Sequence, residues 1–110
     1  MKKCNVLKNN RDFNRIISSF KPFKSKYFVI YIEKSNDEIY HFGISVGKKI
    51  GNAVTRNKYK RRVRSIIDKN NYQKGFNCII ILKGSILNID YNEMENALVK
   101  SLRDLKIVEE

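Results

Sequence analysis

The sequence predicts an α+β fold, a two-layer α/β sandwich with its elements in the order α-β-β-α-β-α. The first observation behind this prediction is that segments with the apolar spacing of helices alternate with short runs of β-branched and aromatic residues. The second is the absence of any linker, internal repeat or low-complexity stretch, and the third is a length of 110 residues, enough for one modest core. We therefore expect a single domain over residues 1–110, with residues 1–8 as a flexible N-terminal segment.

The first helix is predicted to begin at residue 10, with Asn9 or Asn10 as its N-cap. Lys21-Pro22 ends it, because the residue before a proline is disfavoured in the helical conformation. Four apolar side chains at positions i, i+3, i+4 and i+7 form its single apolar stripe. They are Phe13, Ile16, Ile17 and Phe20.

Two strands follow the first helix. Residues 27–32 are rich in β-forming residues, residues 35–37 are typical of a turn, and residues 40–46 predict a second strand that pairs antiparallel with the first. A loop at residues 47–52 then leads into a helix at residues 53–69.

The last third of the chain contains one strand and one helix. After Gly75, residues 76–82 form an unbroken apolar run, which predicts a strand buried on both faces. Residues 83–85 predict a turn, and Asn92 is expected to cap a helix at residues 93–105. The buried stripe of this helix is Met94, Leu98, Val99 and Leu102.

The chain has a formal net charge of +12, and the excess lies in its first two-thirds. Residues 1–69 hold 18 basic and five acidic side chains, whereas residues 70–110 hold five basic and six acidic ones. No carboxylate lies between Glu38 and Asp68, and eight cations fall within 17 positions of this interval. They are Lys48, Lys49, Arg56, Lys58, Lys60, Arg61, Arg62 and Arg64. A one-signed cluster of this density repels itself unless a polyanion neutralises it, so a nucleic acid is the expected partner.

The composition argues against membrane, secreted and metal-binding classes. The longest apolar run, residues 78–82, is far shorter than the roughly 18–20 residues of a membrane span. The N-terminus lacks the apolar segment of a secretory signal, so we expect a cytoplasmic protein. Cys4 and Cys78 are far apart and the chain has one histidine, so we expect free thiols and no metal site.

The helix at residues 53–69 has two different sides. At 100° per residue, five polar side chains share one of them. They are Arg56, Asn57, Lys60, Arg61 and Arg64. Tyr59, Val63 and Ile66 lie on the opposite side, which is expected to dock on the sheet. Guanidinium groups bind phosphate bidentately, and the glutamates that would steady an ordinary solvated helix at i+4 are missing, so we expect an RNA or DNA contact face.

Residues 43–61 carry a specific resemblance to a known family. They read GISVGKKIGNAVTRNKYKR and closely resemble the signature of the bacterial ribonuclease P protein subunit, with its glycine-led strand, basic loop and Arg-Asn-Arg-x-Lys-Arg helix. The similarity extends to residues 7–13 and to the strand at residues 27–31. Lys58 and Ile17 depart from the family pattern, which usually has arginine at the first position and often an aromatic residue at the second.

The resemblance implies a function and a detail of the fold. Members of this family bind a large catalytic RNA, and the complex removes the 5′ leader of precursor tRNA by hydrolysing one phosphodiester bond, with Mg²⁺ held mainly by the RNA and the substrate. The expected partners are therefore the ribonuclease P RNA and precursor tRNA, with no membrane, DNA or obligate protein partner. The resemblance also implies a left-handed βαβ crossover between the strand that ends near Val46 and the strand from Phe76, where the general rule predicts a right-handed one.

Two surfaces carry over from the family to this chain. The first is an RNA-contact surface formed by the basic loop and the helix. Its residues are Lys48, Lys49, Asn52, Arg56, Asn57, Lys60, Arg61 and Arg64. The second is a cleft for the single-stranded leader, formed by Phe13, Ile17 and Tyr31, which is sensible because single strands bind by stacking on aromatic side chains beside cations. For Phe13 and Tyr31, packing in the core is the alternative.

Three other functions have less support in the sequence. A protein nuclease needs convergent carboxylates, but Asp90, Glu93 and Glu95 lie outside the cationic region. His41 has no partner at a recognisable spacing, so no protein catalytic residue is expected.

A structural RNA-binding protein of ribosomal type would share the charge and element order but not the motif at residues 43–61. A helix-turn-helix DNA-binding protein needs two helices joined by a short turn, whereas strands separate the helices here.

Overall fold

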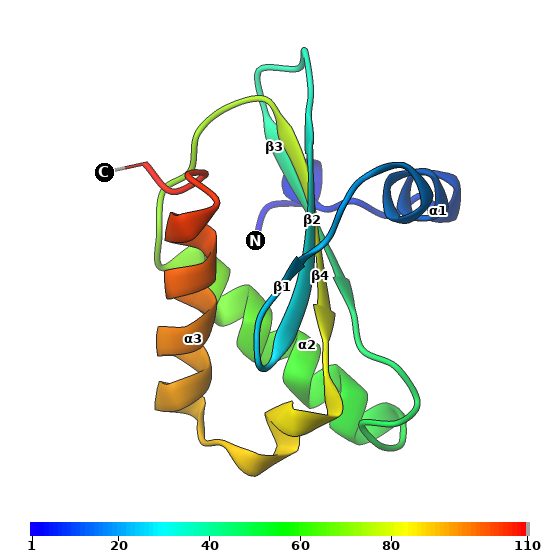
Figure 1. Cartoon of the computed structure of the whole chain (residues 1–110), viewed down its shortest axis with the longest axis vertical. Helices are drawn as coiled ribbons and strands as arrows, with labels where there is room; N and C mark the ends of the chain where they lie inside the picture. Colours follow the sequence, from blue (N-terminus) through cyan, green and yellow to red (C-terminus); the bar gives the residue numbers. More distant parts are fainter. Residues whose placement is uncertain (110) are drawn as a thin grey trace.

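The structure, a computed structural model, describes residues 1–109, which form a four-stranded mixed sheet and three α-helices (Figure 1). The main elements are α1 (Asn10–Ser19), β1 (Phe23–Lys24), β2 (Phe28–Lys34), β3 (Tyr40–Ser45), α2 (Ala53–Asp68), β4 (Phe76–Leu82) and α3 (Tyr91–Asp104). Two short 3₁₀ helices are η1 (Lys3–Asn5) and η2 (Gly84–Asn88). The predicted α+β sandwich is confirmed: in Figure 1, α2 and α3 form one layer against the sheet, and α1 adds a helix on the opposite face.

The order of the strands, β1-β2-β4-β3, shows that one predicted pairing was wrong. Residues 27–32 and 40–46 do not pair with each other, because β4 lies between β2 and β3. β4 pairs antiparallel with β2 and parallel with β3. Its residues Cys78, Ile79 and Ile80 are fully buried, and a strand that is apolar on both faces is most stable in the middle of a sheet.

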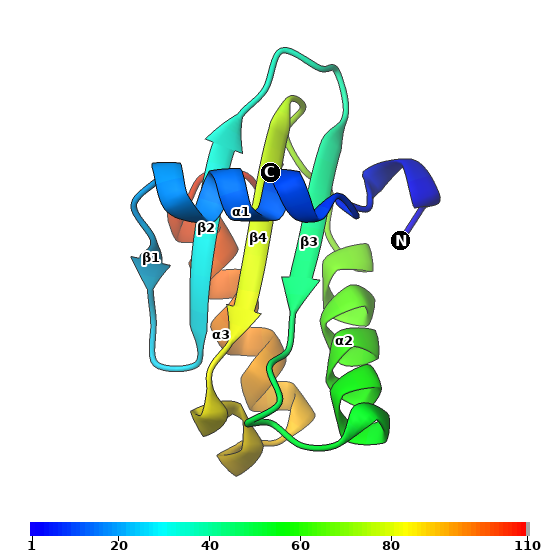
Figure 2. The ribbon, with the colours of Figure 1, turned by 90° about the vertical axis from the view of Figure 1, so that its right-hand side faces the viewer.

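The connection from β3 through α2 to β4 is a left-handed crossover. The two strands are parallel neighbours. In Figure 2 both strands point down and β3 lies to the right of β4, while Figure 1 shows that α2 is on the side away from α1 and hence behind the sheet in Figure 2. This arrangement confirms the crossover implied by the family resemblance and departs from the right-handed rule.

The main core lies between the sheet and the two helices α2 and α3. Every second side chain of a strand points into this core, and the helices contribute their apolar stripes. Fully buried members of this core include Phe28, Ile30, Phe42, Val63, Ile66, Cys78, Ile80, Met94, Leu98 and Leu102. The stripe predicted for the last helix is therefore confirmed at Met94, Leu98 and Leu102, whereas Val99 is only partly buried.

Side-chain caps set the beginnings of the helices. Asn9 caps α1 by accepting a hydrogen bond from the backbone N–H of Arg11 at 2.9 Å. α1 ends at Ser19, just before the break predicted at Lys21-Pro22, so Phe20 of the predicted stripe follows the helix. The predicted cap Asn92 is wrong for α3. Asp90 accepts a hydrogen bond from the backbone N–H of Glu93 at 2.8 Å, so the helix begins two residues earlier than expected. Aspartate and asparagine are similarly strong caps, and the pattern alone does not choose between them.

Besides η1, two further short elements were not predicted. β1 has two residues, too few for a sequence pattern, and its pairing with β2 defines it. η2 replaces the turn predicted at residues 83–85 and buries Ile86 completely. β1 adds a short edge strand to the sheet, and η2 connects β4 to α3.

The first eight residues lie along the edge of β3 that β4 does not occupy. The Asn5 side chain donates a hydrogen bond from Nδ2 to the backbone oxygen of Tyr40 at 2.7 Å. The backbone N–H of Leu7 donates to the backbone oxygen of Phe42 at 2.9 Å. These contacts partly cover the edge strand, and the flexibility of residues 1–8 stays a prediction.

Candidate nucleic-acid interface

α2 has one buried and one polar side, as the sequence predicted. The buried side chains are Tyr59, Val63, Ile66 and Ile67. On the polar side, Asn57, Arg61 and Arg64 are exposed, and Arg56 and Lys60 are partly buried. The helix therefore packs on the sheet through one stripe and presents guanidinium, ammonium and amide groups along the other.

The cations of α2 have no carboxylate partner within the described chain. Among residues 1–109, no ion pair involves any side chain between Arg56 and Arg64. At the end of the helix, the N-terminal amino group pairs with Asp68 at 2.6 Å. Glu95 binds Lys69 at 2.8 Å and raises the pKa of its ammonium group. The uncompensated charge thus lies in the first three turns of α2, where it would attract a polyanion.

Two arginines of α2 pack differently from the others. The guanidinium of Arg62 lies 5.3 Å from the centre of the Tyr59 ring, so its stem follows the apolar side of the helix. The Nε of Arg56 is buried and has no hydrogen-bond partner among residues 1–109. A buried donor without an acceptor is costly, so a rotation of Arg56 onto a phosphate oxygen would gain a charge-assisted hydrogen bond.

The loop before α2 adds further positive charge. Lys48 and Lys49 are exposed, and Asn52 follows them as the N-cap of the helix. The Oδ1 of Asn52 accepts a hydrogen bond from the backbone N–H of Thr55 at 3.0 Å. Its oxygen is therefore engaged in capping, and its amide nitrogen remains as the group that could donate to RNA.

Three rows of residues run across β2, β4 and β3 on the face that α1 crosses (Figure 2). The polar row is Glu33, Asn77 and His41; the middle row is Tyr31, Ile79 and Gly43; the open row is Val29, Ile81 and Ser45. α1 lies over the middle row, where Ile16 of the helix and Ile79 of β4 are both fully buried. The polar row and the open row lie on opposite sides of α1.

Gly43 allows α1 to lie close to β3. A Cβ atom at this position would collide with Cζ of Phe13, because the two would lie well inside van der Waals contact. A glycine within a strand is typical of such close approach. The aromatic ring of Phe13 therefore packs directly on the strand backbone.

A hollow of about 360 Å³, which we call the α1 cleft, lies along one side of α1. Residues from three elements line it: α1, β3 and α2. They include Phe13, Asn14, Ile17, Ile44, Ser45 and Lys60. The cleft thus combines apolar side chains with an amide and with one of the α2 cations.

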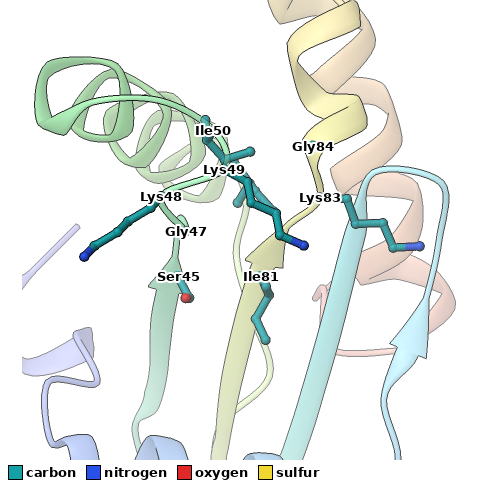
Figure 3. A pocket seen from close by; sticks show the side chains of 9 residues that line it. Ser45, Gly47, Lys48, Lys49, Ile50, Ile81, Lys83 and Gly84 are labelled. Carbon is teal, nitrogen blue, oxygen red and sulfur yellow. The ribbon is translucent and has the colours of Figure 1, made fainter.

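A second hollow of about 570 Å³, the lysine pocket, lies at the end of β3 and β4 (Figure 3). Lys48, Lys49 and Lys83 line it around an apolar floor that includes Ile81. Figure 3 shows the side chains of Lys49 and Lys83 extending to the same side and Lys48 extending the other way. Ser45 lines both the lysine pocket and the α1 cleft, so the two hollows adjoin.

The structure brings together two of the three predicted cleft residues. Phe13 and Ile17 both line the α1 cleft. Tyr31 is a partly buried member of the middle row on β2, two strands away from Gly43 and hence about 10 Å distant. It does not line the cleft in this structure, and its role toward a leader stays a prediction.

Sequence reasoning missed three parts of this surface. Asn14 lines the α1 cleft, and Lys83 and Ile81 line the lysine pocket. Gly43 in a strand was an available signal for close packing of α1. No comparable signal marked Lys83, because its place beside the basic loop depends on the parallel pairing of β3 with β4.

The carboxylates considered for a protein nuclease have structural partners. Asp90 caps α3. Glu93 accepts a hydrogen bond from the hydroxyl of Tyr27 at 2.9 Å, and Glu95 pairs with Lys69. Each of the three therefore has a role in folding that accounts for its position.

His41 belongs to the polar row, where its Nδ1 lies 2.9 Å from Oδ1 of Asn77. Because that oxygen can only accept, Nδ1 is the donor in this pair. Among residues 1–109, no three His, Cys, Asp or Glu side chains cluster as a metal site would require. No helix in this part of the chain is long and apolar enough to cross a membrane.

The left-handed crossover, the uncompensated cations of α2 and the adjoining cleft define a class of small α+β proteins suited to a nucleic-acid partner. The family model described as Ribonuclease P matches residues 1–106. The chain therefore belongs to the ribonuclease P protein family. Membership implies a role as protein component of an endoribonuclease complex in tRNA processing, with an RNA subunit as its partner.

Individual relatives agree with this assignment. A ribonuclease P protein component from Mycoplasma capricolum is 39% identical over 109 residues, which cover 96% of this chain and 100% of the relative. One from Streptococcus pyogenes is 36% identical, with 99% and 92% covered. Among solved structures, the RNase P protein from Staphylococcus aureus has a TM-score of 0.86 at 30% identity, with 97% of this chain and 100% of that chain covered. The RNase P protein from Thermotoga maritima has a TM-score of 0.80 at 30% identity, with 90% and 96% covered.

Proposed function

We propose that this protein binds the ribonuclease P RNA and the 5′ leader of precursor tRNA, and that it promotes leader removal without performing the chemical step itself. The polar side of α2 binds RNA phosphates through Arg56, Arg61 and Arg64. The α1 cleft and the lysine pocket hold single-stranded leader nucleotides. The RNA supplies the reacting groups and the divalent ions.

The observation that carries this proposal is the continuity of the three surfaces. Lys60 belongs both to the polar side of α2 and to the α1 cleft. Ser45 belongs both to the α1 cleft and to the lysine pocket. A single strand that enters beside α2 can therefore stay in contact with the protein up to Lys83. Apolar walls beside cations suit single-stranded RNA, because bases pack on the walls while phosphates meet the charges.

The Mg²⁺ that the family resemblance implies does not require a site built by this protein alone. Mg²⁺ keeps several waters and is usually held by one or two carboxylates together with phosphates, and residues 1–109 contain no cluster of three His, Cys, Asp or Glu side chains. We therefore assign Mg²⁺ to the RNA and the substrate and derive no step through a protein-bound ion. The contribution of the protein is to neutralise phosphate charge and to hold the leader in place.

The proposal is tested by cleavage of a 5′-labelled precursor tRNA at low Mg²⁺. Three reactions are compared: the cognate ribonuclease P RNA alone, this protein alone, and both together. We expect cleavage at the mature 5′ end when both are present and little with either alone, because limiting Mg²⁺ leaves phosphate repulsion unscreened without the protein.

The other results would overturn the proposal in different ways. Cleavage by the protein alone would show an active site within this chain. Equal cleavage by RNA with and without the protein would favour the structural RNA-binding role. Leader binding in the α1 cleft is tested separately with Ile17→Ala, which should weaken binding of leader-bearing tRNA and leave mature tRNA unaffected. Tyr31→Ala, at a residue outside the cleft, tests whether the leader also reaches β2; an equal loss on both tRNAs would show that Tyr31 is a core residue.

A further inference from the structure

A chain of hydrogen bonds lies on the side of α1 that faces away from the α1 cleft. Arg15 of α1 forms a two-bond ion pair with Glu33 of β2, in which Nη2 lies 3.0 Å from Oε1 and Nη1 contacts Oε2. Asn77 of β4 donates from Nδ2 to Oε1 of Glu33 at 2.9 Å. His41 of β3 then contacts Oδ1 of Asn77 at 2.9 Å. One helix residue is thus connected to a residue on each of three strands.

The chain of hydrogen bonds and the cleft lie on opposite flanks of the same helix. At 100° per residue, Arg15 points about 150° away from the mean direction of the α1 residues that line the cleft. The sheet shows the same division, because Glu33 belongs to the polar row and Ser45 to the open row, with α1 between them. Any sliding of α1 across the sheet therefore changes both sides at once.

Apolar packing alone holds α1 weakly. Ile16 is its only fully buried side chain within residues 1–109. Ile17 is 36% exposed and Phe20 is 38% exposed. One buried isoleucine and the ring of Phe13 can keep the helix on the sheet but do not define its position along the strands. The ion pair between Arg15 and Glu33 defines this position, because two guanidinium nitrogens contact both carboxylate oxygens. Asn77 in turn donates a hydrogen bond to the same carboxylate.

We infer that Arg15, Glu33 and Asn77 form a latch that positions α1 and so sets the width of the α1 cleft for the leader. They are positioning residues, since none of them lines the cleft. The inference rests on the proposed function of the cleft. It concerns only the leader, so binding of mature tRNA should not depend on the latch.

Substitution of Glu33 is the decisive test, because the electrostatic effect and the positioning effect predict opposite changes in RNA affinity. If only the electrostatic field mattered, removal of a carboxylate from a cationic protein would strengthen RNA binding. If the latch positions α1, the same change would weaken binding of leader-bearing tRNA. Arg15 does not separate the two effects, since loss of its charge weakens binding either way.

The experiment measures the affinity of the assembled complex of protein and ribonuclease P RNA for precursor tRNA and for mature tRNA. The variants are Arg15→Ala, Glu33→Ala and the double variant. Arg11→Ala is the matched control, because it removes the same charge from an exposed site on α1 that forms no ion pair within residues 1–109. Glu33→Gln and Arg15→Lys are the conservative variants, and thermal unfolding of each protein is recorded alongside.

We expect Arg15→Ala and Glu33→Ala each to weaken precursor binding by about fivefold, with mature tRNA unchanged. The double variant should lose little more than either single variant, because both changes break the same latch. Arg15→Lys should recover part of the affinity, and Arg11→Ala should stay within about twofold of the wild type. If Glu33→Ala does not fold, Glu33→Gln gives the decisive comparison, with the same direction of change.

The contrary results separate the latch from the proposed function. If Glu33→Ala and Glu33→Gln bind precursor tRNA as tightly as the wild type or more tightly, the latch is refuted while the cleft assignment stands. Equal losses on precursor and mature tRNA would show a purely structural role for the ion pair and also refute it. If the wild-type complex itself does not distinguish precursor from mature tRNA, the proposed leader function fails, and the inference about the latch fails with it.

Discussion

The two faces of the sheet differ in how they are covered. Under α2 and α3, side chains such as Phe28, Phe42 and Ile80 pack into a continuous core that excludes water. Under α1, the large side chains that are fully buried within residues 1–109 are Ile16 and Ile79, and the rest of the face is a polar row on one side and an open cleft on the other. The face under α2 and α3 thus provides most of the stability. The face under α1 buries less apolar surface and leaves more side chains accessible.

The largest effect should come from a matched pair in β4 that compares the two faces directly. Ile79 and Ile80 are neighbours, both fully buried, and point to opposite faces. We expect Ile80→Ala to lower the free energy of unfolding by about 4 kcal/mol and Ile79→Ala by about 2 kcal/mol, because α1 can settle into the smaller space whereas the main core cannot. Urea denaturation measures both. Equal losses would show that the α1 face is packed as tightly as the main core.

Gly43→Ala should cost about 2 kcal/mol, since the added methyl group would collide with the ring of Phe13. The change should also weaken precursor binding, because relief of the collision requires α1 to move. Phe13→Leu in the same protein removes the ring atoms nearest to the new methyl group and should restore part of the stability. Unfolding midpoints of the two single variants and the double variant test this. An additive double variant would show that the glycine is required for another reason.

The elements that could be predicted from the sequence depend on neighbours along the chain. The polar side of α2 follows from helical spacing alone, and the end of α1 follows from Lys21-Pro22. The insertion of β4 between β2 and β3 could not be predicted in the same way, because turn residues at 35–37 fit a hairpin equally well. The insertion of β4 places Glu33, Asn77 and His41 side by side, so the polar row could not be predicted from local sequence patterns either.

The same limit applies to the candidate site. Lys60 was predicted from its place on the α2 helix, and the structure adds that it also lines the α1 cleft. Lys83 was missed, since it joins Lys48 and Lys49 only after β3 and β4 pair. Helical spacing thus predicted which charged side chains share one side of α2. The order of the strands decides which charged side chains from different elements share a surface.

Arg61→Ala should reduce the activity of the complex at low Mg²⁺ by about tenfold, because a guanidinium that binds phosphate makes charge-assisted hydrogen bonds. Stability should be unchanged, as Arg61 is exposed and forms no ion pair within residues 1–109. Arg103→Ala, in the last turn of α3 and outside the polar side of α2, is the matched control with the same loss of charge. Raising Mg²⁺ should restore most of the lost activity.

Similar losses for Arg61→Ala and Arg103→Ala would show that net charge, not the polar side of α2, determines binding. The salt dependence provides a second check. If Arg61 contacts one phosphate, the slope of log affinity against log salt should fall by roughly one unit in Arg61→Ala and stay at the wild-type value in Arg103→Ala.

The smallest effect concerns the pH dependence of the α1 face. The hydrogen bonds from Arg15, and to a lesser extent from Asn77, hold the pKa of Glu33 below its ordinary value despite partial burial. A carboxyl group whose pKa is lower in the folded than in the unfolded protein stabilises the fold above its unfolded pKa, and this contribution is lost as the pH falls through the folded value. The stability difference between the wild type and Glu33→Gln should therefore be greatest near pH 7, at no more than about 1 kcal/mol, and should shrink below about pH 4. Urea denaturation of both proteins between pH 3 and pH 7 measures it. A stability difference that does not change with pH would mean that the charge of Glu33 does not stabilise the fold. The two faces of the sheet would then differ in packing but not in the pH dependence of their contribution to stability.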